Sequence, residues 1–495
     1  MKNYNFEPQH NDTNKNVTNG LLNAGVTQMV SLFVQFSSII ILSRLLAPSD
    51  FGLLAMVAPI YGFAALFQDV GLNQATVQKD KIGHDAINAF FWINIAVGMV
   101  LAILLAVLSP VAGWYYHEPR VVELTIGMGL LILIGSFSNQ HSAILQRRMK
   151  FGSLSIIGML GSLGGLATSI AWAYYIGDYW ALYFGMAVAI IIPSIGVWVA
   201  TKWIPSAPRR VSGIRGMLMF GAGITSTNIM GFFARNLDNV LIGRTWGNQE
   251  LGMYDRGYKL LMFPLQRIVS PIGGVMIPVM SRLVNEPEQY RNIFLKTIGQ
   301  LTFAIWPGIM WAFMSRDTLV PTLLGKNWTE VIAIFTPLAI AGFVQVVNHP
   351  IGWLFITQGR SGDYARCGLI TAITSILAFV IGLPYGAVGV ATAYAISEFI
   401  RMPFIWWYVT RRGPIVPLDV ITAVTPQCVS CLASGVALFI FYNNTNLPPL
   451  ILLGSGCVLS YSVFTLTMAL FPSGRKTINR TIATFRHLML RVKLS

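Results

Sequence analysis

Three arginines lie inside apolar stretches that are long enough to span a membrane. They are Arg235, Arg267 and Arg401. A charge inside a bilayer is costly and is kept where it has a partner, an aqueous cavity or a ligand of opposite charge. Guanidinium groups bind phosphate oxygens through two parallel hydrogen bonds, so these residues offer the chemistry that holds a phosphate or diphosphate.

Two of these arginines have an acidic residue one helical turn away, on the same helical face. Asp238 follows Arg235, and Glu398 precedes Arg401. Each pair can be a local ion pair that holds helices together or a coupling pair in a transport path, and the sequence leaves both open. Arg267 has no acidic residue in its own apolar stretch. This isolation favours a water-filled site or an anionic ligand for Arg267.

Amide side chains in the same stretches can supply the hydrogen bonds that sugar hydroxyls need. We predict a polar lining that comprises Asn23, Gln28, Gln345 and Asn348, with Arg44 as a further cation and Asp69 as a further ion-pair or coupling candidate. The alternative for each amide is a hydrogen bond between two packed helices, which is a common use of such residues in membranes.

Three prolines recur at a seven-residue spacing in one stretch, at Pro264, Pro271 and Pro278. Each proline removes a backbone hydrogen bond, and this spacing places all three on nearly one helical face. We therefore predict a hinge at these positions, with a static kink as the alternative.

The elements that must position these residues follow from composition. Of 495 residues, 54% are hydrophobic and 11% are charged, whereas about a quarter are charged in an ordinary soluble protein. Apolar runs of about 20 residues, enough to cross a bilayer, recur along the chain. We predict an all-α polytopic membrane protein with about fourteen transmembrane helices. Their approximate bounds are 18–42, 51–70, 85–109, 121–142, 152–176, 179–203, 217–242, 257–281, 292–315, 329–356, 364–383, 386–410, 418–441 and 448–471.

Lys and Arg alternate between the loops on the two sides of this arrangement. With the N-terminus in the cytoplasm, 24 of the 34 basic residues fall on the cytoplasmic side and 7 on the other. The positive-inside rule therefore predicts that both termini are cytoplasmic. The net charge of +15 is explained by loops that face anionic membrane lipids, and it does not require binding to nucleic acid.

Residues that indicate an enzyme are missing from the sequence pattern. Cys428 and Cys431 form a C-x-x-C in an apolar helix without a second pair or nearby histidines, which favours packing over a metal site. The chain offers no nucleophile and base pair, no metal-ligand cluster and no glycine-rich phosphate loop, and its predicted loops are short. We expect no catalytic residues, no metal and no cofactor, and a polymerase or ligase of lipid-linked glycans is the disfavoured alternative.

The chain also resembles itself. Arg44 and Gly52 recur as Arg244 and Gly252 at an offset of 200 residues, and Gln146-x-Arg148 recurs as Gln358-x-Arg360 at an offset of 212. Six helices separate the copies, so the halves are predicted to be parallel pseudo-repeats around a central cavity and to rock against each other. The predicted parts are an N-lobe at 1–212, a C-lobe at 213–412, two extra helices at 413–472 and a basic amphipathic cytoplasmic tail at 473–495.

Several segments together resemble a known family. They are Ser43-Arg44-Leu45-Leu46, Asp50-Phe51-Gly52-Leu53, Asp69-Val70-Gly71-Leu72 with Gln78, Leu145-Gln146-Arg147, the run from Arg235 to Arg244, Leu251-Gly252-Met253-Tyr254 and Pro278-Val279-Met280-Ser281-Arg282. On these residues the chain resembles the polysaccharide transporter family of Wzx-type flippases, and most of all its colanic-acid exporter branch. The wider superfamily also contains the lipid II flippases and the MATE multidrug exporters.

The resemblance implies a V-shaped fold of two helix bundles. It also implies a substrate, an undecaprenyl-diphosphate-linked oligosaccharide repeat unit moved from the inner to the outer leaflet of a bacterial inner membrane by alternating access. The product would be a surface polysaccharide, such as exopolysaccharide, O-antigen or capsule, and the partners would include polysaccharide polymerase or export machinery. Cavity arginines of the family fit Arg235 and Arg267. An ion-coupled MATE-type exporter is the alternative, although such exporters usually carry a carboxylate in their first helix and this chain has none there.

Overall fold

The computed structural model describes residues 13–68, 71–78, 82–208, 214–481 and 483. Within these ranges, side chains are described except for those of residues 13–26, 214–231, 233–235, 263–264 and 267. The regular secondary structure of the described residues is helical throughout, which confirms the all-α prediction. Contacts divide the chain into two compact units, Met1–Gly252 and Met253–Ser495, whereas the finer lobe and tail boundaries stay predictions.

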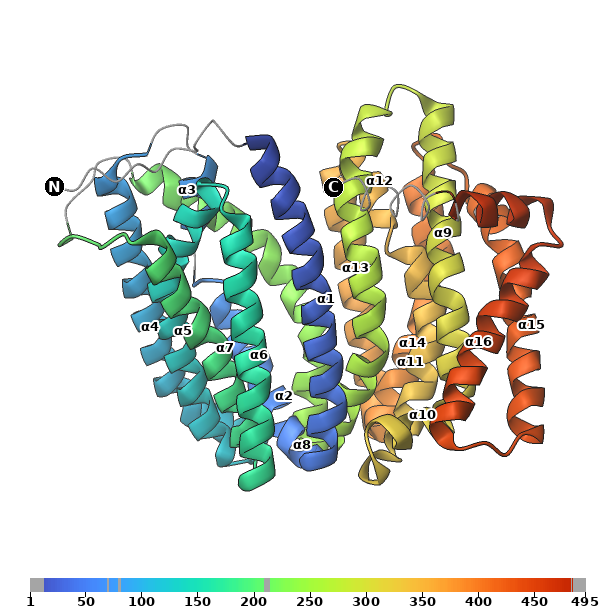
Figure 1. Ribbon diagram of the computed structural model, residues 1–495, viewed down its shortest axis with the longest axis horizontal. Coiled ribbons are helices and arrows are strands. Elements are labelled where there is room, and N and C mark those ends of the chain that lie inside the picture. The colour runs from blue at the N-terminus through green and yellow to red at the C-terminus, as the bar shows by residue number, and fades with distance from the viewer. Residues whose placement is uncertain (1–12, 69–70, 79–81, 209–213, 482, 484–495) are drawn as a thin grey trace. The chain divides into compact units, whose positions relative to one another are not determined.

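The first unit is a bundle of long helices (Figure 1). Its elements are α1 (Thr13–Leu45), α2 (Pro48–Ala65), α3 (Leu72–Gln78), α4 (His84–Tyr116), α5 (Arg120–Arg147), α6 (Phe151–Tyr175), α7 (Trp180–Thr201) and the first part of α8 (Ile214–Arg282). Helix α5 packs on α4 and α7, and helix α6 packs on α7 and α1.

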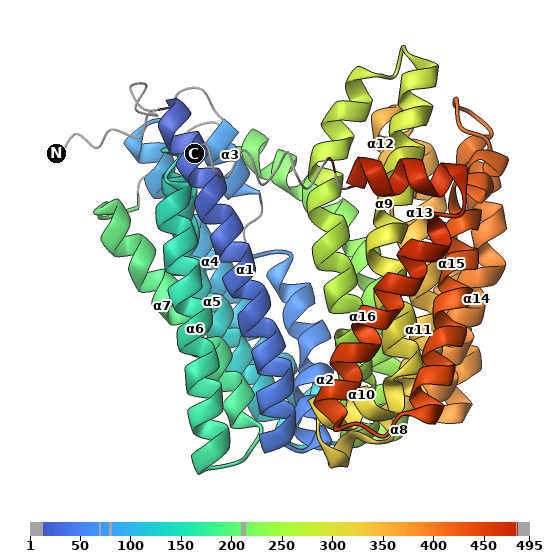
Figure 2. The same cartoon turned by 45° about the vertical axis from the view of Figure 1, so that its right-hand side comes forward.

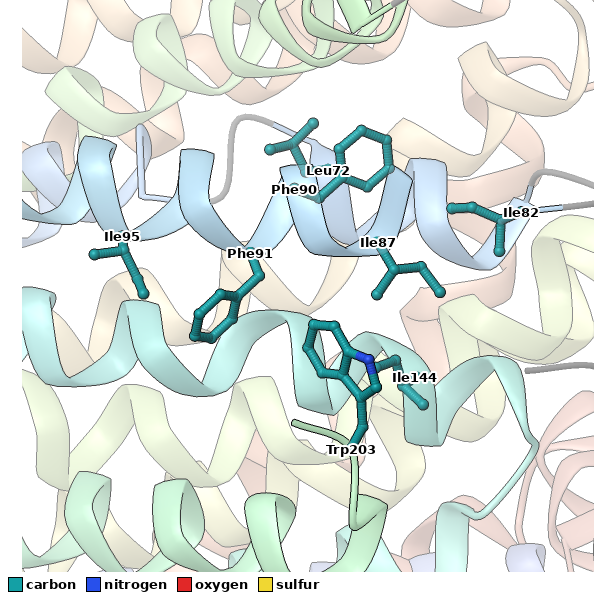
Figure 3. Close-up of a cluster of buried hydrophobic side chains, with 8 residues drawn as sticks. All are labelled: Leu72, Ile82, Ile87, Phe90, Phe91, Ile95, Ile144 and Trp203. Carbon is teal, nitrogen blue, oxygen red and sulfur yellow. The ribbon is translucent and has the colours of Figure 1, made fainter. Parts of the chain in front are cut away.

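A cluster of large apolar side chains forms part of the core of this unit (Figure 3). Phe91 projects from α4 toward Trp203, which follows α7, and Ile144 of α5 lies on the same side. Phe90 projects to the other side of α4, beside Leu72. All five side chains are buried. Full burial of one such side chain contributes on the order of 1.5–3 kcal/mol, so this cluster ties the ends of α4, α5 and α7 together.

The second unit begins in α8 and contains a larger number of elements. They are α9 (Pro287–Met314), α10 (Arg316–Leu323), η2 (Lys326–Trp328), α11 (Val331–Asn348), α12 (Ile351–Thr357), α13 (Ser361–Gly382), η3 (Leu383–Tyr385), α14 (Gly386–Thr410), α15 (Pro417–Asn444) and α16 (Pro449–Met468). Helix α14 packs on α11 and α13, and α9 packs on α11, α15 and α16. A helical segment at 472–481 follows α16 and runs crosswise to it (Figure 2). Most of the predicted amphipathic tail lies outside the described residues.

Ten of the described helical segments are long and apolar enough to cross a membrane. Helix α4 shows how they meet lipid, because Val100, Ile103, Val107 and Val111 are all exposed along one face. Such an apolar face is unfavourable in water and suits the hydrocarbon core. The protein is a multi-pass membrane protein, and the exact number of fourteen crossings stays a prediction.

The main differences from the predicted helices concern how several of the predicted stretches are joined, interrupted or ended. The stretches at 217–242 and 257–281 lie on the two helical parts of α8, which meet at Gly247 without the predicted loop between them. With φ at 81°, Gly247 adopts a conformation that side chains disfavour, and it therefore acts as the break. The predicted helix at 329–356 is interrupted before α12 because Pro350 cannot donate a backbone hydrogen bond. Helix α2 ends at Ala65, and a turn at Gly71 with φ of 72° separates it from α3.

The second internal repeat, Gln146-x-Arg148 and Gln358-x-Arg360, is out of register with the backbone by two residues. After α5, the amide of Lys150 donates to the carbonyl of Leu145 at 2.9 Å, and Met149 has φ of 55°. After α12, the amide of Arg360 donates to the carbonyl of Phe355 at 2.9 Å, and Gly359 has φ of 67°. These are the same helix-ending turn. Because the turn's hydrogen bonds fix its register, the structural offset is 210 residues and not the 212 that the side chains suggested.

Candidate functional site

Arg401 lies in a buried network of the second unit. Its guanidinium forms an ion pair with Glu398, donates to the hydroxyl of Thr374 at 2.8 Å and contacts the hydroxyl of Ser375 at 3.1 Å. A further bond reaches the carbonyl of Thr371 at 3.2 Å. Arg401 and Glu398 are both buried. The predicted pairing of the two residues is therefore present, and the contacts favour the interpretation in which the pair holds α13 against α14.

Two of the predicted amides join the same region from α11. The side-chain amide of Asn348 approaches Glu398 at 3.4 Å, and its carbonyl oxygen accepts a bond from the indole of Trp406 at 3.1 Å. Gln345 donates to the hydroxyl of Tyr394 at 2.7 Å. The structure thus brings Asn348, Glu398 and Arg401 together, with Gln345 bonded to Tyr394 of the same helix as Glu398. The Nε of Arg401 is buried without a hydrogen-bond partner among the residues that the structure describes.

The remaining predicted site residues fall into two groups. Gln28 is half-buried in α1, and Arg44 is exposed in the last turn of that helix. Asp238 is buried in α8, where its carboxylate accepts the backbone amide of Asn239 at 2.9 Å. The side chains of Asn23, Arg235 and Arg267 and the whole of Asp69 lie outside the described residues. Their roles stay predictions.

Along α8, Arg235 precedes the break at Gly247 and Arg267 follows it. The prolines at 264, 271 and 278 all lie after the break, in a part whose described backbone angles are helical. The hinge assigned to Pro264, Pro271 and Pro278 stays a prediction, and the break at Gly247 falls within the loop predicted between 242 and 257.

The first internal repeat, in which Gly52 recurs as Gly252, marks a direct contact within the first unit. A methyl group on Gly52 would lie 1.6 Å from the carbonyl oxygen of Asn248, and one on Gly252 would lie 1.8 Å from the carbonyl oxygen of Pro48. The two contacts are equivalent under the offset of 200 residues, because Gly52 corresponds to Gly252 and Pro48 corresponds to Asn248. We call these two contacts the glycine pair. Backbone meets backbone here, so only glycine fits at either position.

A group of polar residues beside the glycine pair was not among the predicted site residues. Arg120 donates two hydrogen bonds to Glu118, at 2.9 and 2.8 Å, and these bonds lower the pKa of that carboxyl. Glu118 also accepts the side-chain amide of Asn248 at 3.1 Å. Arg244 lies 3.3 Å from His117. The first internal repeat contains Arg244 as the counterpart of Arg44, and this recurrence was the signal that could have identified the group.

The chain is similar to proteins named for the biosynthesis of polysaccharides. A family model described as "Polysaccharide biosynthesis protein" matches residues 41–333. The lipopolysaccharide biosynthesis protein WzxC of Escherichia coli (strain K12) is 22% identical over 73% of this chain and 74% of its own length. The teichuronic acid biosynthesis protein TuaB of Bacillus subtilis (strain 168) is 25% identical over 70% of this chain and 72% of its own.

Two solved structures share the fold. The lipid II flippase MurJ in an inward closed conformation has a TM-score of 0.73 at 11% identity, covering 91% of this chain and 98% of its own. An inward-facing MATE family multidrug transporter has a TM-score of 0.62 at 13% identity, covering 79% of this chain and 98% of its own. Both structures confirm the predicted fold class.

Proposed function

Because the chain belongs to the polysaccharide biosynthesis protein family, we propose that it is a flippase for a lipid-linked oligosaccharide. The substrate is an undecaprenyl-diphosphate-linked repeat unit, which moves from the inner to the outer leaflet of a bacterial inner membrane by alternating access. The lipid chain stays in the bilayer while cationic side chains hold the diphosphate. The observation that carries the proposal is the family match over residues 41–333.

Names of relatives and the shared fold support this substrate class. The curated relatives are named for the biosynthesis of lipopolysaccharide, teichuronic acid and succinoglycan, and one of them is named a transport protein. The fold is shared with the lipid II flippase MurJ. Both termini are proposed to face the cytoplasm, as the distribution of basic residues favours. Polysaccharide polymerase or export machinery is the proposed partner.

Arg235 and Arg267 are the proposed diphosphate ligands, on opposite sides of the break in α8. Arg401 is less suited to this role because its hydrogen bonds are made inside the second unit. Arg267→Ala is expected to lower transport at least about tenfold, as loss of a charge-assisted contact of about 1.5–3 kcal/mol implies. The matched control is Arg282→Ala at the exposed end of the same helix, which should keep full transport.

Deletion of the gene tests the function itself. Lipid-linked repeat units should accumulate on the cytoplasmic leaflet, and surface polysaccharide should be lost until the intact gene is restored. In proteoliposomes, the purified chain should make lipid-linked oligosaccharide accessible to a membrane-impermeant lectin or oxidant. Unchanged surface polysaccharide in a strain without a second flippase gene, together with inactive proteoliposomes, would overturn the proposal.

An ion-coupled exporter of small cationic compounds is the second candidate, since the fold of a MATE transporter also matches. The sequence of α1 contains no Asp or Glu, which removes the usual place for a coupling carboxylate. Drug resistance on overexpression that disappears in Asp238→Asn or Glu398→Gln would favour this candidate. Resistance that is unaffected by the chain would exclude it.

A further inference from the structure

Asp363 lies in the first turn of α13 and is surrounded by four arginines. Its carboxylate accepts a bond from the Nε of Arg360 at 3.1 Å and from the hydroxyl of Tyr408 at 2.9 Å. Guanidinium nitrogens of three further arginines lie 3.6, 3.9 and 3.8 Å away, and they belong to Arg366, Arg411 and Arg412. We call these five charged residues the Asp363 cluster. One carboxylate faces four guanidinium groups, so the cluster carries an excess of three positive charges.

Arg360 has a structural role in this cluster. Its side chain is 12% exposed, and its Nη1 donates to the backbone carbonyls of Val409 at 2.8 Å and Arg412 at 2.7 Å. These bonds tie the start of α13 to the end of α14. Together with Tyr408, Arg360 takes up the near hydrogen-bonding positions of the carboxylate.

The other three arginines are placed differently. Their distances to Asp363 exceed hydrogen-bonding range, so they are attracted to it without being bonded. The exposed side-chain fractions of Arg366 and Arg412 are 75% and 70%, and that of Arg411 is 34%. The N–H groups of Arg366 and Arg412 are therefore accessible to a phosphate, which accepts such donors. The guanidinium of Arg411 lies over the ring of Tyr408, 4.1 Å from its centroid, at the side of the same cluster.

Two apolar stripes lead to this cluster. On α13, Arg366 is followed at helical spacing by the exposed side chains of Leu369, Ile373 and Leu377. On α14, the exposed side chains of Ile400, Phe404 and Trp407 run toward Arg411. The two helices pack together and run in opposite directions, so both stripes end at the cluster. A helix of this length spans roughly 30 Å, the thickness of the hydrocarbon core.

We infer that the Asp363 cluster and these stripes form a binding site for an anionic phospholipid of the membrane. The headgroup phosphate binds Arg366, Arg411 and Arg412, and the acyl chains lie on the apolar faces of α13 and α14. Charge complementarity and continuity with the lipid-facing stripes select a lipid over a soluble phosphate. This site is separate from the proposed diphosphate ligands on α8 and does not depend on the flippase activity.

The experiment uses the full chain in detergent, with dioleoyl phosphatidylglycerol and dioleoyl phosphatidylcholine as probes and native mass spectrometry as the readout. The wild-type chain should retain phosphatidylglycerol in preference to phosphatidylcholine. The double variant Arg366→Gln/Arg412→Gln should bind phosphatidylglycerol at least about tenfold more weakly, since each basic residue near the headgroups contributes about 1 kcal/mol. Its binding of phosphatidylcholine should not change.

The control variant is Arg282→Gln/Lys296→Gln, which removes the same charge from exposed positions outside the cluster. It should bind phosphatidylglycerol as the wild type does. An equal loss in the control would overturn the site in favour of general surface charge. If the test variant unfolds, Arg366→Lys/Arg412→Lys replaces it, and a loss of at least threefold with retained folding supports the site, whereas unchanged binding overturns it.

Two further probes separate the sources of phosphate. Inorganic phosphate and glycerophosphoglycerol lack acyl chains, and neither should displace the bound lipid at millimolar concentration. Displacement by either one would overturn the contribution of the stripes. Undecaprenyl diphosphate should not compete at a concentration equal to that of phosphatidylglycerol, and stoichiometric competition would overturn the assignment to an ordinary membrane lipid.

Discussion

Helices α13 and α14 carry two charged groups that differ in balance and exposure. Around Arg401, one guanidinium meets one carboxylate, Glu398, and both are buried among hydroxyl groups. In the Asp363 cluster, at the end of the same two helices, one carboxylate meets four guanidinium groups, of which two are mostly exposed. In the first group the charges balance and all but the Nε donor of Arg401 find partners inside the described part of the protein, and the second group leaves donors exposed.

The difference shows how a structural charge can be told from a charge that binds a ligand. A buried ion pair is stable where its charges are equal and its hydrogen bonds are complete, because any uncompensated charge is costly. A cluster with excess charge at a membrane boundary is tolerated because water and headgroups compensate it. Balance and exposure therefore say more about function than the presence of an arginine inside an apolar stretch.

The largest expected effect comes from removing one partner of the buried pair. Glu398→Ala leaves the charge of Arg401 uncompensated and should lower the free energy of unfolding by about 3–5 kcal/mol. Denaturation in mixed micelles of dodecyl sulfate and dodecyl maltoside measures this change. A loss below about 1 kcal/mol would mean that the pair is not the dry contact that its burial indicates.

A smaller loss is expected when one neutral partner of Arg401 is replaced. Thr374→Val keeps the shape of the side chain but removes the hydroxyl that accepts at 2.8 Å. The expected loss is about 0.5–2 kcal/mol, the range for hydrogen bonds between membrane helices. Thr392→Val is the control, because its exposed hydroxyl bonds to the carbonyl of Val388 within its own helix.

Replacing both charges of the buried pair should change stability by less than about 1 kcal/mol, with either sign. In Glu398→Leu/Arg401→Met, no buried charge remains, and packing substitutes for the ion pair. The same double variant in the transport assay decides the role of Arg401. Retained transport shows a structural role, whereas lost transport in a folded protein shows that the pair serves transport.

The smallest effect is expected in the exposed cluster when no lipid is bound. Arg412→Gln should alter the free energy of unfolding by no more than about 0.5 kcal/mol, as exposed substitutions usually do. Added phosphatidylglycerol should then stabilise the wild type more than the variant. Equal stabilisation of both would remove the contrast between the two charged groups.

Local sequence patterns predicted the part of these groups that lies within one helix. Glu398 and Arg401 are three residues apart, so their pairing follows from helix geometry. The partners of Arg401 on α13 could not be predicted, because they depend on how α13 packs against α14. The same holds for Asp363. Its neighbours at 360 and 366 are close in sequence, while those at 411 and 412 lie in the turn that follows α14.

Hydropathy predicted where helices exist but not how they join. The predicted loop between 242 and 257 is helical apart from a break at Gly247, because one glycine with positive φ can redirect the chain without a loop. The turns after α5 and α12 have the same hydrogen bonds at an offset of 210 residues. The prediction of 212 was wrong by two residues because it followed the glutamine and arginine side chains, which recur at a different spacing from the backbone turn.

The glycine pair limits which amino-acid substitutions this chain can accept during evolution. A damaging substitution in a packed interior is often relieved by a second one that trims the neighbouring side chain. At Gly52 and Gly252 the neighbouring atoms are carbonyl oxygens of Asn248 and Pro48, which every residue type carries. No second substitution at those neighbours can remove them. A search for suppressors of Gly52→Ala should therefore return revertants at position 52, whereas Gly158→Ala, whose added methyl would meet open space, should need none.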